Sequence, residues 1–372
     1  MFKQLYWLIL LILLFNTSMA NVEIDFANTH ITYLKKNTTD LYYYLADYNK
    51  LRTNVFHTWG PLKNTLMVDW ENFMGKDYLN SASYTAIKNA TFNLPFTPYR
   101  YLYQSDTVAG RVFLHRAYTE IQNQNNTLAI GLQSMPMGVG RIWAPLDVFN
   151  LFSSYHEIAG VLGIKYTHYL NDLSFVKLVT NFKEEFKVDK YGGLCKTHVW
   201  GSDMGLTLLN SENFMIIGGE IEANLLDTGI EVRAEGGRFD DKTRDSKYIK
   251  YILGADYAFP NMVTLAIEYF FNGLGGDNYH DYDTNLWSDD NGYLAKHYLG
   301  SSLGYVYNPL INFSNTNMVN LVDGSVYSAI SAGYSLNDNA SVDLTAVLFY
   351  GQEGSEFKLY SNSYYLRWSN YF

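Results

Sequence analysis

Residues 263–269 read VTLAIEY, and their side chains alternate between two kinds. Every second residue is large and apolar, and the residues between them are Thr264, Ala266 and Glu268. Because successive side chains of a β-strand point to opposite faces, this period of two predicts a strand with one apolar face and one mixed face. Residues 230–235, 250–257 and 342–348 repeat the pattern, so the sequence predicts an all-β protein.

The composition excludes several classes of protein. The chain has 372 residues, of which 17% are aromatic and 17% charged, and its formal net charge is -10. So many rings argue against disorder, and one cysteine in 372 residues excludes a disulfide scaffold and a cysteine-rich metal site. An acidic chain also lacks the basic face that nucleic acid requires. We therefore expect no cofactor and no nucleic-acid partner.

The N-terminal residues 1–20 read MFKQLYWLILLILLFNTSMA. Lys3 precedes an apolar run from Leu5 to Phe15, and Ser18-Met19-Ala20 provides the small residues of a cleavage site. This order predicts a secretory signal peptide, with a retained membrane anchor as the alternative. The mature domain would then comprise residues 21–372.

The C-terminal residues 364–372 read YYLRWSNYF and alternate in the same way, ending in Phe372. Such a strand resembles the signal by which bacterial outer-membrane barrels are recognised for insertion, although Asn370 stands where an outward apolar residue is usual. The resemblance implies an outer-membrane location, contact with lipid and lipopolysaccharide, and the barrel-assembly machinery as a partner. The alternative is a soluble sandwich whose last strand ends in Phe.

The second face of each strand favours a barrel over a sandwich. It mixes charge, glycine and small residues, which suits a water-filled interior, while the apolar face suits lipid. Only a closed sheet pairs every backbone group in a membrane. We therefore predict a transmembrane antiparallel up-and-down β-barrel with short periplasmic turns and longer outer loops. Counting turns back from Phe372 gives about 18 strands, with about 16 as the alternative.

The segment from Gly75 to Val108 is too long to be an idle connection. Its aromatic residues and two prolines predict an ordered structure. It either folds into the interior as a constriction, with Arg100 lining the pore, or forms a cap over the barrel mouth.

The segment Leu128 to Asn150 reads LAIGLQSMPMGVGRIWAPLDVFN. Its spacing resembles a signature in a broad group of Gram-negative outer-membrane barrels, porin-like or alginate-export-like, in which Gly-x-Gly-Arg-x-Trp-x-Pro-x-Asp-x-Phe follows a strand. The sequence departs from that signature at Leu132, where the group tends to have arginine. The resemblance implies a barrel and, beyond that, a transport activity. The matching positions are Ile130, Gly131, Gln133, Gly138, Gly140, Arg141, Trp143, Pro145, Asp147, Phe149 and Asn150.

Glycine at two positions of this segment lets its backbone turn inward. Arg141 and Asp147 are then placed to pair with each other or with charges of the barrel wall, while Trp143 and Phe149 anchor the loop. Both a structural role and direct contact with solute fit these residues.

The leading functional prediction is a porin-like channel for passive diffusion of small hydrophilic solutes, and the alternative is a polysaccharide-associated barrel that exports or anchors a surface glycan. The sequence contains no His-Glu-x-x-His helix. Gly-x-Ser-x-Gly occurs once, at residues 300–304, but no helical pattern follows it to form a nucleophile elbow, so we expect no enzyme. Residues 274–292 are acidic but lack the calcium-loop pattern, so no metal site is expected. The polar-face candidates for lining the pore are Arg52, Lys165, Lys177, Glu231, Arg233, Glu235, Lys250 and Glu268.

Overall fold

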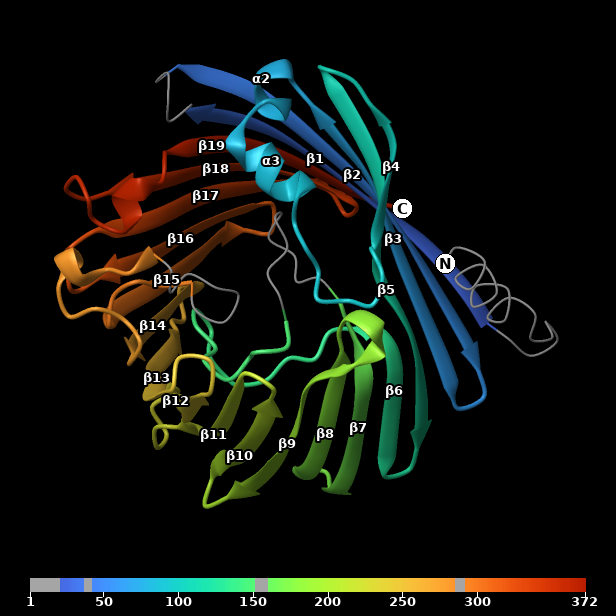
Figure 1. Ribbon diagram of the computed structural model, residues 1–372, viewed down its shortest axis with the longest axis vertical. Coiled ribbons are helices and arrows are strands. Elements are labelled where there is room, and N and C mark those ends of the chain that lie inside the picture. Colours follow the sequence, from blue (N-terminus) through green and yellow to red (C-terminus); the bar gives the residue numbers. More distant parts are fainter. Residues whose placement is uncertain (1–20, 37–41, 151–159, 285–291) are drawn as a thin grey trace.

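The strands form a single closed sheet. The computed structural model describes residues 21–36, 42–150, 160–284 and 292–372, and it contains one sheet of 19 strands (Figure 1). The sheet closes where β1 (Asn21–Lys36) pairs with β19 (Ser363–Tyr371). In the described chain β4 (Tyr99–Gln104) pairs only with β5 (Val108–Asn123), and the other eighteen strands form the ring. The predicted antiparallel barrel of 18 strands is therefore confirmed.

The register is antiparallel throughout, and neighbours in the ring are neighbours in sequence except where β1 pairs with β19 and where β3 pairs with β5. This up-and-down order needs only hairpin connections, in keeping with the predicted turns. The remaining strands are β2 (Tyr43–Trp59), β3 (Leu62–Met74), β6 (Asn126–Gln133), β7 (Val161–Asn171), β8 (Ser174–Phe182), β9 (Val188–Val199), β10 (Ser202–Ser211), β11 (Phe214–Asn224), β12 (Glu231–Asp241), β13 (Ser246–Ala258), β14 (Val263–Asn272), β15 (His297–Asn308), β16 (Ile311–Asn320), β17 (Val326–Asn337) and β18 (Ala340–Tyr350).

Short turns and longer loops alternate, as predicted. We call the end of the barrel at which the chain finishes the turn end. Its turns include 60–61, 200–201 and 309–310. The long segments lie at the opposite loop end, but the division is not strict. β10 and β11 are joined there only by Glu212 and Asn213, whereas the turn-end connection 225–230 is longer. Residues 1–20 and 285–291 lie outside the described residues, and with them the predicted signal peptide and part of the acidic segment.

The alternation at 263–269 separates the two faces of the wall. The side chain of Glu268 is 0% exposed and lies on the inner face, whereas Ile267 is 43% exposed and lies on the outer face. The same division holds on β13, where Lys250 is buried and Leu253 is exposed. The outer face is therefore largely apolar, and the charges predicted for the polar face lie inside.

The segment that follows β3 folds into the barrel. It contains α2 (Lys76–Leu79) and α3 (Ala82–Lys88), and Ser81 caps α3 by accepting a hydrogen bond from the Tyr84 N–H. Tyr84 and Ile87 of α3 are buried in one cluster with inner-face residues that include Tyr48 and Phe73. Of the two alternatives, the structure therefore shows an inward fold rather than a cap.

The period-two pattern gave no sign of these helices, which are short and lie outside the strands. Three 3-10 helices, η1 (Glu184–Phe186), η2 (Tyr279–Asp281) and η4 (Phe357–Leu359), lie in loop-end connections. None of the helices in the described part of the chain is long and apolar enough to cross a membrane.

Candidate functional site

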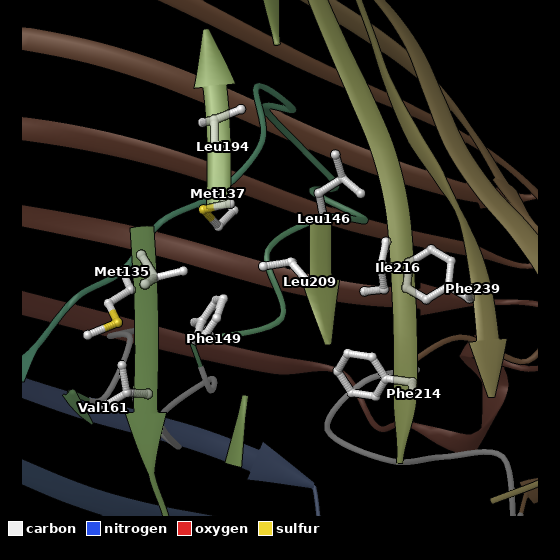
Figure 2. Close-up of a cluster of buried hydrophobic side chains, with 11 residues drawn as sticks. Met135, Met137, Leu146, Phe149, Val161, Leu194, Leu209, Phe214, Ile216 and Phe239 are labelled. Carbon is white, nitrogen blue, oxygen red and sulfur yellow. The ribbon is translucent and has the colours of Figure 1, made fainter. Parts of the chain in front are cut away.

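The inner loop, residues 134–150, leaves β6 and runs along the inside of the wall. Its apolar side chains Met135, Met137, Leu146 and Phe149 are buried in one cluster with side chains of the wall (Figure 2). Burying each large side chain contributes about 1.5–3 kcal/mol, so these contacts hold the loop firmly. The wall side chains in the cluster are Val161, Val179, Leu194, Leu209, Phe214, Ile216 and Phe239.

Glu235 of β12 holds the backbone of the inner loop. Its carboxylate accepts hydrogen bonds from the N–H groups of Val139 at 2.6 Å, Gly140 at 3.0 Å and Leu146 at 2.7 Å. Inside the protein these N–H groups would otherwise lack an acceptor, which costs free energy. Glu235 therefore stabilises the loop, although the sequence suggested that it lines the pore.

Glu268 of β14 serves the next turn of the same loop. It accepts the N–H groups of Arg141 at 2.6 Å, Ile142 at 2.8 Å and Trp143 at 3.1 Å. Arg233, whose side chain is fully buried, lies 3.2 Å from the Glu268 carboxylate. The loop backbone and one guanidinium together compensate the buried negative charge.

Close contacts with neighbouring atoms require glycine at positions 138 and 140 of the inner loop. Gly138 has φ of 85°, and a Cβ there would overlap the Glu235 carboxylate. A Cβ on Gly140 would overlap the carbonyl oxygen of Trp143. Both positions therefore need glycine, the first for its left-handed backbone as well as for space.

Trp143 and Phe149, the predicted loop anchors, are both buried but in different clusters. The Trp143 ring lies 5.5 Å from the Phe270 ring and 6.3 Å from the Tyr298 ring, in a cluster with Ile252. Phe149 belongs to the cluster of Figure 2. The loop is thus fixed at its middle and near its C-terminal end.

Asp147 does not pair with Arg141. Both oxygens of the Asp147 carboxylate accept hydrogen bonds from the Asn150 amide, each 2.8 Å long. Asn150 also accepts the Met135 N–H at 3.0 Å, and so ties the two ends of the loop together. Burial raises the pKa of Asp147 to about 6, although hydrogen bonds from Asn150 oppose this.

Arg141 extends from the loop toward an acidic part of the wall. Its guanidinium lies 3.0 Å from Glu231, 3.5 Å from Asp256 and 3.9 Å from Glu222, and its side chain is 51% exposed. Of the two pairings expected for Arg141, the structure shows the one with wall charges. Arg233 contacts the same Glu231 and Asp256 from within the wall.

Basic side chains lie on the inner face of β7, β8 and β9. Lys165 of β7 and Lys177 of β8 lie on the inner face and are partly exposed, and the Lys177 ammonium lies 5.6 Å from the Phe175 ring. Lys196 of β9 pairs with Glu220 at 3.1 Å. Lys250, in contrast, is buried against the rings of Phe239 and Tyr248.

A recess of about 610 Å³ opens near the turn end of the inner face. Arg52 lines this recess and forms a bidentate ion pair with Asp69, in which two guanidinium nitrogens lie 2.6 and 2.7 Å from the carboxylate oxygens. Two further acidic and amide side chains of the recess, Asp25 and Asn54, are hydrogen-bonded to each other. Arg52 is therefore an inner-face residue away from the inner loop.

Arg100 does not lie on the inner face. In the register of β4 with β5 it is opposite Val112, and Val112 is in turn opposite Trp70, which is exposed on the outer face. Directly opposed residues of a sheet point to the same side. The expectation of a pore-lining Arg100 therefore fails, because the segment re-enters the wall as a strand at that point.

Comparisons with known proteins agree with this geometry. No family model matches the chain, and no curated protein matches its sequence. Solved structures do match over 95% of the chain. OccAB1 of Acinetobacter baumannii is 11% identical, with a TM-score of 0.58 over 96% of its own length.

Two further matches cover 99% of their own chains. A BenF-like porin from Pseudomonas fluorescens Pf-5 is 9% identical with a TM-score of 0.62, and the outer membrane protein opdK from Pseudomonas aeruginosa is 11% identical with a TM-score of 0.58. The chain has an outer-membrane porin fold. The expected likeness to alginate-export barrels has no counterpart in these three structures.

Sequence reasoning missed two contributions to the interior of this porin fold. It treated Glu235 and Glu268 as pore-lining charges, but their oxygens face backbone N–H groups of the inner loop. It also overlooked the hydrogen bonds of Asn150, although Asn150 belongs to the recognised signature. The sequence did contain a signal for the role of Glu235 and Glu268: each is an acid on the inner face of a strand, and the Gly-x-Gly turn of the inner loop offers backbone N–H groups to such acids.

Proposed function

We propose that the protein is a channel for passive diffusion of small hydrophilic solutes across the outer membrane, and that the inner loop forms its constriction. The observation that carries the proposal is the path of this loop, which is fixed to the inner wall by two carboxylates and two buried aromatic rings. A loop held in this way narrows the interior while leaving a constant aperture.

The charges at the constriction define the solutes that it would favour. Arg141 projects from the loop beside Glu222, Glu231 and Asp256, while Lys165 and Lys177 lie on the inner face of β7 and β8. A passing solute would therefore meet charges of both signs. Such a field favours small polar or dipolar solutes over strongly charged ones, with only weak ion selectivity.

Single-channel recording of the refolded protein in a planar bilayer tests this proposal. We expect a steady open conductance at neutral pH, and a shift of the reversal potential toward cation selectivity when Arg141 is replaced by glutamine. Lys247→Gln is the matched control, since it also removes one positive charge but lies on the outer face, where Lys247 pairs with Asp240 at 3.3 Å. A folded barrel that never conducts would contradict the proposal and favour a glycan-associated role.

A further inference from the structure

The outer face of β1 and β2 is polar in its middle. Asn28, His30 and Thr32 alternate with inward residues on β1, and Asp47 and Asn49 do so on β2. We call these five residues the seam cluster, because β1 and β19 meet beside it. Elsewhere, as on β13 and β14, the corresponding outer positions are apolar residues such as Leu253 and Ile267.

The side chains of the seam cluster contact one another. The Thr32 hydroxyl donates to Asp47 at 2.6 Å, and the His30 ring lies 3.5 Å from the same carboxylate. The Asn49 amide donates to the Asn28 carbonyl oxygen at 2.9 Å. The His30 and Asp47 side chains are 40% and 38% exposed, so both remain accessible from outside the barrel.

The polarity of these two strands is reversed locally. Their inner face is apolar at Ile31, Tyr44, Ala46 and Tyr48, which are buried in the cluster that includes α3. Because the interior is filled by a folded segment here, the inner face no longer meets water. The outer face carries the polar residues instead, and Asn370 of β19, directly opposite Asn28, extends the cluster.

Apolar residues flank the seam cluster on both sides. Val22 and Ile24 are exposed on the outer face toward the turn end, and Leu34 and Leu45 are exposed toward the loop end. The cluster thus lies within the apolar band, where lipid headgroups do not reach. Ionisable and amide groups at that depth are expensive and mark a contact with something other than acyl chains.

A second polar group lies on the outer face of β15–β17. The Asn317 amide donates to Ser301 at 3.3 Å and to Asn315 at 2.5 Å, and the Ser328 hydroxyl donates to Asn317 at 2.7 Å. We call these four residues the amide cluster. It offers donors to a carboxylate and acceptors to an imidazole, and it therefore complements the Asp47 and His30 of the seam cluster.

We propose that the outer face from β15 through β19 to β2 is a lateral contact surface for a second copy of this chain in the membrane. This face carries the amide cluster at one end and the seam cluster at the other, with exposed apolar residues such as Ile330, Leu344 and Leu366 between them. Each copy carries both clusters, so one copy supplies the donors and acceptors that the other needs. Acyl chains supply neither. Polar side chains that bond between proteins within a bilayer stabilise their association.

The mass of the protein extracted with its native lipid in polymer nanodiscs tests the proposal. We expect the wild type to be multimeric and the double variant H30L/D47L to associate about tenfold more weakly, since two polar groups are lost from the contact. The variant places apolar groups toward lipid, so the barrel should fold, which heat-modifiable gel mobility checks. D240L/K247L is the matched control, because this ion pair, 3.3 Å long, lies on the outer face of β12 and β13, near their loop ends.

Cross-linking locates the contact. In L34C/C195S the new thiol lies beside the seam cluster, whereas the chain's own cysteine lies on β9, away from β1 in the ring. We expect a bifunctional thiol reagent to link copies of L34C/C195S to one another but not copies of the wild type. A monomeric wild type, an unchanged H30L/D47L, or recovery with a different protein instead of a second copy would overturn the proposal. The mass does not depend on conductance, so this failure is distinct from failure of the channel proposal.

Discussion

Replacing Glu235 by alanine should release the middle of the inner loop. The substitution removes the acceptor of three backbone N–H groups, those of Val139, Gly140 and Leu146. A buried N–H group left without a partner costs about 1–3 kcal/mol, so the docked loop should lose about 3–9 kcal/mol. The apolar contacts of Phe149 and the three hydrogen bonds to Glu268 remain, so we expect partial rather than complete detachment.

The assay is single-channel recording combined with limited proteolysis of folded protein. We expect Glu235→Ala to give a larger and noisier conductance and cleavage near residue 140, where the wild type is protected. Glu235→Gln should be intermediate, because it keeps one oxygen acceptor but introduces an NH₂ group among N–H donors. Asp343→Asn serves as the control, since it also removes an inner-face carboxylate but touches no loop N–H. Unchanged conductance and protection in Glu235→Ala would refute the assignment of this carboxylate to the loop.

Three further predictions follow from the same contacts. Gly140→Ala should displace the loop and lower the thermal stability of the barrel, as measured by heat-modifiable mobility, because its Cβ would overlap the Trp143 carbonyl. Gly201→Ala, in an open turn, should lower the thermal stability less, despite the φ of 75° at Gly201. Burial raises the pKa of Asp147 from 3.8 to about 6, so its contribution to loop docking should be fully present below about pH 4 and be lost as the pH rises through about 6. Asp147→Asn should remove this dependence of proteolytic protection on pH. Replacing Lys177 by glutamine should shift the reversal potential in a salt gradient toward cations, and the same shift for the outer-face Lys247→Gln would contradict an inner-face role.

The reversed strands show how a polar pattern can be misread. On β1 the residues from Asn28 to Tyr33 alternate as regularly as those of 263–269, but there the apolar side faces inward. Periodicity identifies two faces and cannot say which one meets lipid, because that depends on what fills the interior. Here α3, contributed by a segment some 50 residues later, decides it.

In the candidate site, residues of the same charge on the inner face have different roles. Arg141 projects into the interior as its place in a tight loop suggested, but the acids facing it come from three different strands. Glu235 and Glu231 are four residues apart on one face of β12, yet one accepts backbone N–H groups and the other contacts Arg141. Spacing along a strand could place both inside, but only the path of the loop separates their functions.

The sequence by itself determined the barrel, its strand number and the alternation of short turns with longer loops, because these follow from local period-two patterning and turn residues. It also indicated the inner loop through its glycines, Trp143 and Phe149. Only the tertiary structure decided which carboxylates hold that loop, that Arg100 faces outward, and that β1 and β2 present polar groups to the membrane. Those outcomes depend on contacts between residues as much as 127 positions apart, which no local pattern encodes.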